Sequence, residues 1–236
     1  MSYQAQEDTG VPIQFNSDQI SELSERIQDL STRKANFADR LIVLIAGVPG
    51  SGKSTVAYNV CKALNSQQLK TEVLPQDGFH YYREELGKFD NPEEAIERRG
   101  APFTFNSRAF LNLISKLNDP TNKNIDILAP SFDHKLKDPV EEDIQISADT
   151  KVIIIEGNYV LLKDPIWSEI SHIADDTWYV EASSEEVRLD RIIKRHLAAG
   201  IASTVEDARA RAMGSDQLNA SYIVENSQTP NVIVKN

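Results

Sequence analysis

The chain has 236 residues, enough for one α/β domain with insertions or for two small domains, and we expect one domain with a lid. Its 25 Lys and Arg against 36 Asp and Glu give a net charge of -11, which argues against a surface that follows a nucleic-acid backbone. The lone Cys61 excludes an internal disulfide framework, and the sequence has no apolar run of membrane-spanning length. The composition therefore predicts a cytoplasmic protein, with the nucleus as a second compartment, that binds neither nucleic acid nor membranes.

The N-terminal part of the chain predicts an arm followed by a helix. Residues 1–16 are polar and contain Gly10 and Pro12, so we expect a flexible arm there. Over residues 17–35, apolar side chains recur at three- and four-residue spacing, which predicts an amphipathic helix capped by Asn16 or Ser17. A buried strand at residues 41–46 comes next and runs directly into a glycine-rich stretch.

This stretch fits the pattern of a phosphate-binding loop, in the strand-loop-helix context that the pattern requires. Its glycines let backbone N–H groups and the N-terminus of the next helix point at an anion. Lys53 would reach the β and γ phosphates of a nucleotide, Ser54 would offer its hydroxyl to Mg²⁺, and Thr55 would bond the α phosphate. An ordinary strand-turn-helix corner is the structural alternative. The predicted nucleotide-binding residues are Gly47, Val48, Pro49, Gly50, Ser51, Gly52, Lys53, Ser54 and Thr55.

The rest of the chain alternates strands and helices, as expected for a parallel sheet covered by helices. Further strands are predicted at residues 71–76, 151–155, 176–180 and 232–234. Further helices are predicted from residue 53 to about 64 and at residues 107–118, 165–174, 184–199, 204–212 and 216–226. Two segments interrupt the alternation: residues 125–147 predict a hairpin-like insertion over the site, and residues 184–215 predict a helical lid.

Two carboxylates follow predicted strands. Asp77 follows the strand at 71–76, and Glu156 follows the strand at 151–155. Carboxyl ends of parallel strands share one edge of a sheet, so we expect both side chains near the phosphate loop. Phosphoryl transfer to an alcohol needs a carboxylate that accepts the hydroxyl proton, a role that suits Asp77, and oxygen ligands for Mg²⁺, which Ser54, Asp77 and Glu156 could provide. In the alternatives, Asp77 caps a turn and Glu156 pairs with a lysine.

The lid helix and the residues near Asp77 complete the predicted site. Arg191 and Arg195 lie four residues apart, so both would project from one helix face over the phosphates; a solvated helix face is the alternative. Aromatic and polar side chains beside Asp77 and in the insertion would line the acceptor pocket, or else belong to the core. The predicted acceptor residues are Phe79, His80, Tyr81, Arg99, Phe132, Asp133 and His134.

These motifs resemble those of the P-loop kinases that include uridine kinase, phosphoribulokinase and bacterial-type pantothenate kinase. The resemblance runs from Leu41 to the C-terminus and rests on residues 47–55, 76–80 and 155–159, where the family places its phosphate loop, its catalytic aspartate and a strand ending in Glu-Gly. It is closest to a uridine kinase-like branch. It implies a three-layer P-loop fold whose five parallel strands, counted from residue 41, follow the order 2-3-1-4-5.

The resemblance also implies an activity. We expect a kinase that uses ATP and Mg²⁺ to phosphorylate a hydroxyl of a small molecule, uridine or cytidine first, with pantothenate, a sugar or a glycerate-like acid as the alternatives. A GTPase-like switch is disfavoured because residues 122–126 place Asp126 one residue too far along for the guanine-reading pattern. A catalytically silent nucleotide-binding regulator is disfavoured because Lys53, Asp77 and Glu156 are all present. The sequence does not predict an oligomeric state.

Overall fold

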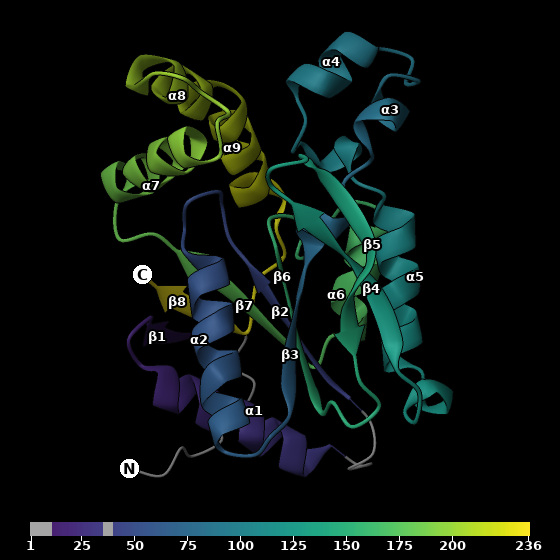
Figure 1. Ribbon diagram of the computed structural model, residues 1–236. Coiled ribbons are helices and arrows are strands. Elements are labelled where there is room, and N and C mark those ends of the chain that lie inside the picture. Colours follow the sequence, from purple (N-terminus) through teal and green to yellow (C-terminus); the bar gives the residue numbers. More distant parts are fainter. Residues whose placement is uncertain (1–10, 35–39) are drawn as a thin grey trace.

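Six parallel strands form the central sheet of the molecule (Figure 1), seen in a computed structural model that describes residues 11–34 and 40–236. Their order across the sheet is β1-β8-β7-β2-β6-β3. The strands are β1 (Ile13–Asn16), β2 (Leu41–Ala46), β3 (Thr71–Pro75), β6 (Val152–Gly157), β7 (Asp176–Glu181) and β8 (Val232–Lys235).

The neighbouring strands β2 and β6, both inside the sheet, are buried on both faces. Every residue of β2 and β6 is buried. Successive residues of β2 point to opposite faces of the sheet, so Ile42 and Leu44 enter one hydrophobic cluster and Leu41 and Val43 enter another. This is the pattern of parallel strands that are covered by helices on both sides.

Helices fill the outer two layers and stand over one end of the sheet. One face is covered by α1 (Ile20–Arg33) and α2 (Lys53–Ser66). The other face is covered by α5 (Ser107–Asn118), α6 (Trp167–Ile173) and α9 (Gln217–Asn226). At the end where the strands point their carboxyl termini, the lid stands on one side and two short helices on the other (Figure 1). The lid consists of α7 (Glu185–Ala198), α8 (Val205–Arg211) and the π-helical turn η4 (Ala212–Asp216), and the short helices are α3 (Arg83–Leu86) and α4 (Pro92–Glu97).

The predicted strand order is confirmed, and one strand is added to it. Read from β3 to β8, five strands follow the expected order 2-3-1-4-5. The sixth, β1, corrects the predicted arm, because residues 13–16 pair in parallel with β8 from Ile13 opposite Val232 to Asn16 opposite Lys235. Of the rest of that arm, residues 1–10 lie outside the described residues.

The helix predicted at residues 17–35 begins later than expected. Its first residue is Ile20 and its N-cap position is Gln19, which makes no side-chain capping bond to the helix. Neither Asn16 nor Ser17 caps it, because β1 continues through Asn16, whose backbone N–H donates to Gln19 Oε1 at 2.7 Å. Residue 35, the predicted end of the helix, lies outside the described residues.

A buried ion pair fastens α1 to the sheet. Arg26 Nε and Nη2 donate to Asp176 Oδ2 and Oδ1 at 2.7 and 2.9 Å. The Asp176 side chain is fully buried, and it also accepts from Trp178 Nε1 at 2.7 Å and Asn231 Nδ2 at 2.9 Å. A buried carboxylate needs this number of donors to offset its lost hydration, so the network fixes one position of α1 on the sheet.

The predicted insertion is an antiparallel hairpin of β4 (Ile127–Asp133) and β5 (Asp138–Ile146), separate from the main sheet. Its base joins the core through Ile127, Ala129 and Ile146. The strands extend further toward the turn than expected, because Asp133 Oδ1 accepts from the N–H groups of Lys135 and Leu136 at 2.7 and 3.0 Å.

In the described part of the chain, no helix has the length and apolar character to span a membrane.

Candidate active site

The phosphate loop turns between β2 and α2 at the carboxyl edge of the sheet. Gly52 has a φ of 95°, a conformation that favours glycine, and a Cβ there would collide with Asn236 Nδ2. Two side chains hold the loop's carbonyl groups: Asn236 Nδ2 donates to Ser51 O at 2.7 Å, and Arg191 Nη1 lies 3.4 and 3.3 Å from Gly50 O and Ser51 O. The N–H groups of the first turn of α2 have no intrahelical acceptor, so they suit an anion such as phosphate.

Lys53, Ser54 and Glu156 meet at this loop. Ser54 Oγ donates to Glu156 Oε1 at 3.0 Å. Burial raises the pKa of Glu156, against the charge of Lys53, which lowers it. Burial likewise lowers the pKa of Lys53, while the carboxylates of Glu156 and Asp77 raise it and Arg195 lowers it. Lys53 is thus a desolvated cation balanced by two nearby carboxylates.

Asp77 lies in the 3₁₀ helix η1 (Gln76–Phe79), directly after β3. Gln76 locks this turn to the end of β6, because its Oε1 accepts from Tyr159 N at 3.0 Å and its side chain occupies the space that a Cβ on Gly157 would need. The parallel register also sets Pro75 beside Glu156. The two strand ends therefore bring Asp77 close enough for its charge to raise the pKa of Glu156.

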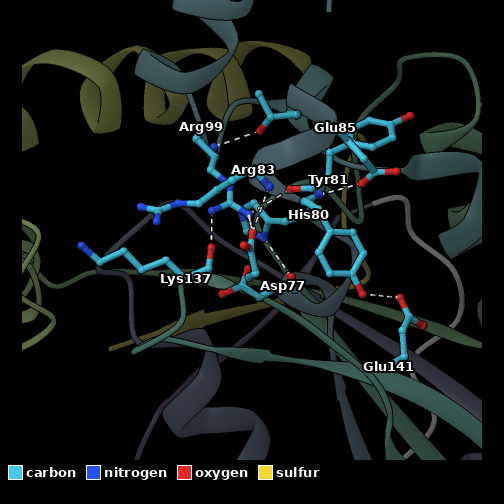
Figure 2. Close-up of polar contacts among 12 residues, drawn as sticks. Asp77, His80, Tyr81, Arg83, Glu85, Arg99, Lys137 and Glu141 are labelled. Carbon is cyan, nitrogen blue, oxygen red and sulfur yellow. Dashed lines mark hydrogen bonds and ion pairs between the residues drawn. The ribbon is translucent and has the colours of Figure 1, made fainter. Parts of the chain in front are cut away.

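His80 and the hairpin form the wall next to Asp77. Gly78 lets the hairpin approach, since a Cβ there would collide with Pro130 O. The His80 ring packs on Phe105 and Phe132, with centroids 3.9 and 4.9 Å apart. Burial lowers the pKa of His80 despite the nearby Asp77 charge, so the ring is neutral at neutral pH. Its Nδ1 lies 2.8 Å from Asp77 O, which can only accept, so Nδ1 carries the proton (Figure 2).

A cavity of about 370 Å³ opens between this wall and the lid, with Asp77 in its lining. Six other residues predicted for the site line it: Pro49, His80, Arg99, Phe132, His134 and Arg195. Its lining also contains functional candidates that the sequence analysis did not single out: Arg83, Lys137, Asn158, His196, Arg211 and Asp216. Of these, Asn158 had a sequence signal in its place directly after the Glu-Gly strand end, and His196 had one in its place beside Arg195 on the predicted lid helix.

Three predicted acceptor residues do not line this cavity. Phe79 is buried in the core and packs on Phe110 of α5, with ring centroids 4.7 Å apart. Tyr81 packs edge-on against Phe89, and its carbonyl accepts from Arg99 Nη2 at 2.9 Å. Asp133 caps the hairpin turn as described above. For these three side chains the structure gives packing and turn roles in place of acceptor contacts.

The arginines of α7 occupy three different environments. Arg188 is buried, donates to Pro49 O at 3.3 Å and bonds both oxygens of Glu185, so it ties the helix to the phosphate loop. Arg191 contacts the loop carbonyls, and Arg195 is exposed in the cavity lining.

The next residue, His196, is buried, and its Nε2 lies 3.1 Å from Asp216 Oδ2 in η4. This pair links α7 to the far end of the lid.

The site fits nucleotide phosphates and a magnesium ion. Among the described residues there is no group of three or more His, Cys, Asp or Glu side chains that could hold a metal by themselves. Mg²⁺ in kinases needs only one or two carboxylates, because phosphate and water oxygens complete its octahedron. Ser54 and Glu156, already 3.0 Å apart, with Asp77 nearby, form such a donor set.

A parallel sheet with a phosphate loop, two carboxylates at neighbouring strand ends and a helical lid defines a P-loop kinase fold. The chain belongs to the phosphoribulokinase / uridine kinase family, whose model matches residues 42–233. A Schizosaccharomyces pombe protein described as "Putative uridine kinase C227.14" is 34% identical over 225 residues, with 94% of each chain covered.

Solved structures give the same fold. A "putative fructose transport system kinase" from Silicibacter sp. TM1040 superposes with a TM-score of 0.79 at 28% identity, covering 91% of this chain and 98% of the other. YFH7 from Saccharomyces cerevisiae, described as "a putative P-loop containing kinase with a circular permutation", superposes with a TM-score of 0.77 at 23% identity, covering 92% and 98%. At this identity, the similarity to YFH7 supports the fold alone.

Proposed function

We propose that this protein is an ATP-dependent kinase that transfers the γ phosphate to a hydroxyl group of a small metabolite. The observation that carries the proposal is that Ser54 of the phosphate loop bonds Glu156 at 3.0 Å beside Lys53, while Asp77, whose charge acts on both Lys53 and Glu156, lines a cavity of about 370 Å³. A silent nucleotide-binding regulator would have no need for these groups together. Family membership supports the same reaction type.

In the proposed step, the acceptor oxygen forms a bond to the γ phosphorus while the bond from that phosphorus to the β–γ bridging oxygen breaks and ADP leaves. Asp77 orients the acceptor hydroxyl and takes its proton. Lys53 stabilises the negative charge on the moving phosphoryl group, and the loop N–H groups hold the β phosphate. Mg²⁺, held by Ser54 and Glu156 with Asp77, would neutralise phosphate charge when bound.

The lid residues Arg191 and Arg195 have a proposed role in the closed state. Arg191 already contacts the phosphate loop, and the Arg195 charge acts on both Lys53 and Glu156. Arginines that meet the phosphoryl charge only after closure stabilise the transition state more than the ground state. Closure would also exclude water, which otherwise competes with the acceptor for ATP.

Several classes of compound are candidates for the acceptor. The resemblance and the description of the fission yeast relative favour uridine or cytidine, and the description of the Silicibacter structure favours a sugar. Pantothenate and a glycerate-like acid are further alternatives within the resemblance. All of these offer the hydroxyl that Asp77 requires.

The test is incubation of the protein with MgATP and a panel of these compounds, followed by mass spectrometry. We expect one class of compound to gain a phosphoryl group in step with ADP formation. Tight ATP binding with no phosphorylated product from any acceptor would favour the silent regulator and overturn the kinase proposal.

A further inference from the structure

The acceptor cavity is rich in positive charge, although the chain as a whole carries a net charge of -11. Two carboxylates line it, Asp77 and Asp216, against five cationic side chains: Arg83, Arg99, Lys137, Arg195 and Arg211. A concave surface of one sign raises the local concentration of the opposite ion. The cavity is therefore built to receive negative charge.

Nucleotide phosphates account for only part of this charge. Arg195 belongs to α7, which contacts the phosphate loop through Arg191, so it serves the donor side. Arg83, Arg99 and Lys137 come from the opposite wall: the start of α3, the turn after α4 and the hairpin turn. We call these three residues the cationic cluster.

Asp138 connects two residues of the cationic cluster by hydrogen bonds. Its Oδ1 accepts from Arg99 Nη2 at 2.7 Å and from the backbone N–H of Arg83 at 3.0 Å, and Arg99 Nη1 donates to Lys137 O. Arg99 is half-buried, and burial lowers its pKa, with the charge of Arg83 adding to that effect against Asp138. The Arg99 side chain is therefore occupied by Asp138 and the Lys137 carbonyl, and Asp138 also holds the backbone of Arg83.

The remaining two cations of the cluster lack a carboxylate partner within the described part of the chain. The Lys137 ammonium has only a long contact of 3.4 Å to Gly200 O of the lid, and the hydrogen bond of Arg83 comes from its backbone. Figure 2 shows both side chains extending to the left of the view, the side away from Glu141. Two positive charges that line one cavity repel each other. An anion bound between them would attract both and offset this repulsion.

We propose that the acceptor carries an anionic group, a carboxylate or a phosphate, which Arg83 and Lys137 bind while Asp77 faces the hydroxyl; this rests on the kinase function proposed above. A guanidinium matches either anion with two parallel hydrogen bonds, and an ammonium adds a point charge. An uncharged nucleoside would leave both cations uncompensated. A solvated surface is the competing explanation, and it predicts no effect of these two residues on acceptor binding.

The first experiment compares acceptors that differ in charge but keep a hydroxyl, using MgATP and the wild-type chain. D-glycerate is paired with glycerol and pantothenate with panthenol to test a carboxylate, and fructose 6-phosphate is paired with fructose to test a phosphate. Uridine and cytidine are uncharged references. We expect one anionic compound to exceed its uncharged partner and both nucleosides about tenfold or more in kcat/KM. Equal use of both members of every pair, or preference for an uncharged compound, overturns the proposal.

The second experiment removes the charges one at a time. Arg83→Gln and Lys137→Gln should each raise the KM of the preferred anion about tenfold, with the KM of ATP and kcat within about twofold of wild type. Lys137→Arg should restore binding. Lys135→Gln, on the same hairpin turn but outside this cavity, is the matched control and should change nothing. An unchanged acceptor KM in both Gln variants contradicts the proposal.

A binding measurement separates this proposal from the kinase proposal. Calorimetry with a non-hydrolysable ATP analogue follows the anions and their uncharged partners without any transfer step. Anion binding that depends on Arg83 and Lys137, without phosphorylation, would overturn the kinase function and keep the anion site. Phosphorylation of uncharged compounds alone would keep the kinase function and overturn the anion site.

Discussion

The donor half and the acceptor half of the candidate site are built in different ways. In the donor half, Lys53 and Ser54 follow one buried strand and meet Glu156 at the end of its neighbour. In the acceptor half, separate surface segments converge, and cations such as Arg83 and Arg211 are exposed. Buried strands fix the position of reactive groups, whereas loops and short helices can change residue by residue. The groups that we assign to the reaction therefore lie at the ends of strands in the sheet. The groups that we assign to the choice of substrate lie on the segments above it.

The largest expected loss of turnover is at Lys53, in the donor half. Lys53→Ala should lower kcat about 10³-fold, because one charge that stabilises the migrating phosphoryl group is lost. Steady-state kinetics measures the effect, and a thermal melt checks the fold. Lys62→Ala, an exposed lysine on the same helix, is the matched control and should keep wild-type turnover. Near-normal turnover in a folded Lys53→Ala protein would contradict the kinase function.

Asp77 stands between the two halves. Asp77→Asn keeps the size of the side chain and removes the proton acceptor, so acceptor phosphorylation should fall about 10²-fold while MgATP still binds. Kinetics and an ATP titration measure the two effects separately. Asp149→Asn, an exposed carboxylate paired with Lys70, serves as the control. A loss of only a few-fold would mean that Asp77 caps a turn and that another group is the base.

The lid should give a smaller effect that falls on kcat. Arg195→Ala should lower kcat about tenfold and weaken ATP binding less, because we place this arginine on the phosphoryl group only in the closed state. Arg191→Ala should show the same bias. Lys194→Ala changes a neighbouring exposed lysine that pairs with Asp190 and should have no effect. Unchanged kcat in both arginine variants would leave α7 as a solvated face.

The smallest effect on turnover should come from the ion pair under the sheet. Asp176→Asn removes the charge of a buried carboxylate that accepts from Arg26, Trp178 and Asn231, so the free energy of unfolding should fall by about 3 kcal/mol, while kcat at 25 °C stays near wild type. Urea denaturation measures the first quantity and steady-state kinetics the second. Asp29→Asn breaks an exposed pair with Arg33 and should cost under about 1 kcal/mol. A fall in kcat as large as that of the lid variants would show that this network supports the site.

The donor half could be predicted from the sequence because its groups are contiguous or end buried strands. After Lys151, residues 152–155 of the predicted strand are all apolar, so its position in the sheet and the placement of Glu156 followed from one local pattern. The strand order came from the resemblance. The placement of Glu156 and the strand order both depend on short buried strands, which can occupy few positions in the sheet.

The acceptor half could not be predicted in the same way. Phe79 and His80 are adjacent aromatic side chains, and only the packing of Phe79 on Phe110 of α5 decides which of them lines the cavity. Arg83 and Asp138 are 55 residues apart and meet through a single hydrogen bond. Strand β1 was missed because four residues with one buried side chain, Phe15, are too few to show a period.

The place of β1 in the sheet also sets an order of folding. Among the described residues, β1 pairs only with β8, so the strand that begins at residue 13 must wait for the strand that begins at residue 232. During synthesis from the N-terminus, β2, β6 and β3 can come together first, while β1 has no strand to join until residues 232–235 have emerged. Parallel pairing across so long a separation closes a large loop and is slow. The β1 edge of the sheet should therefore form after the β3 edge.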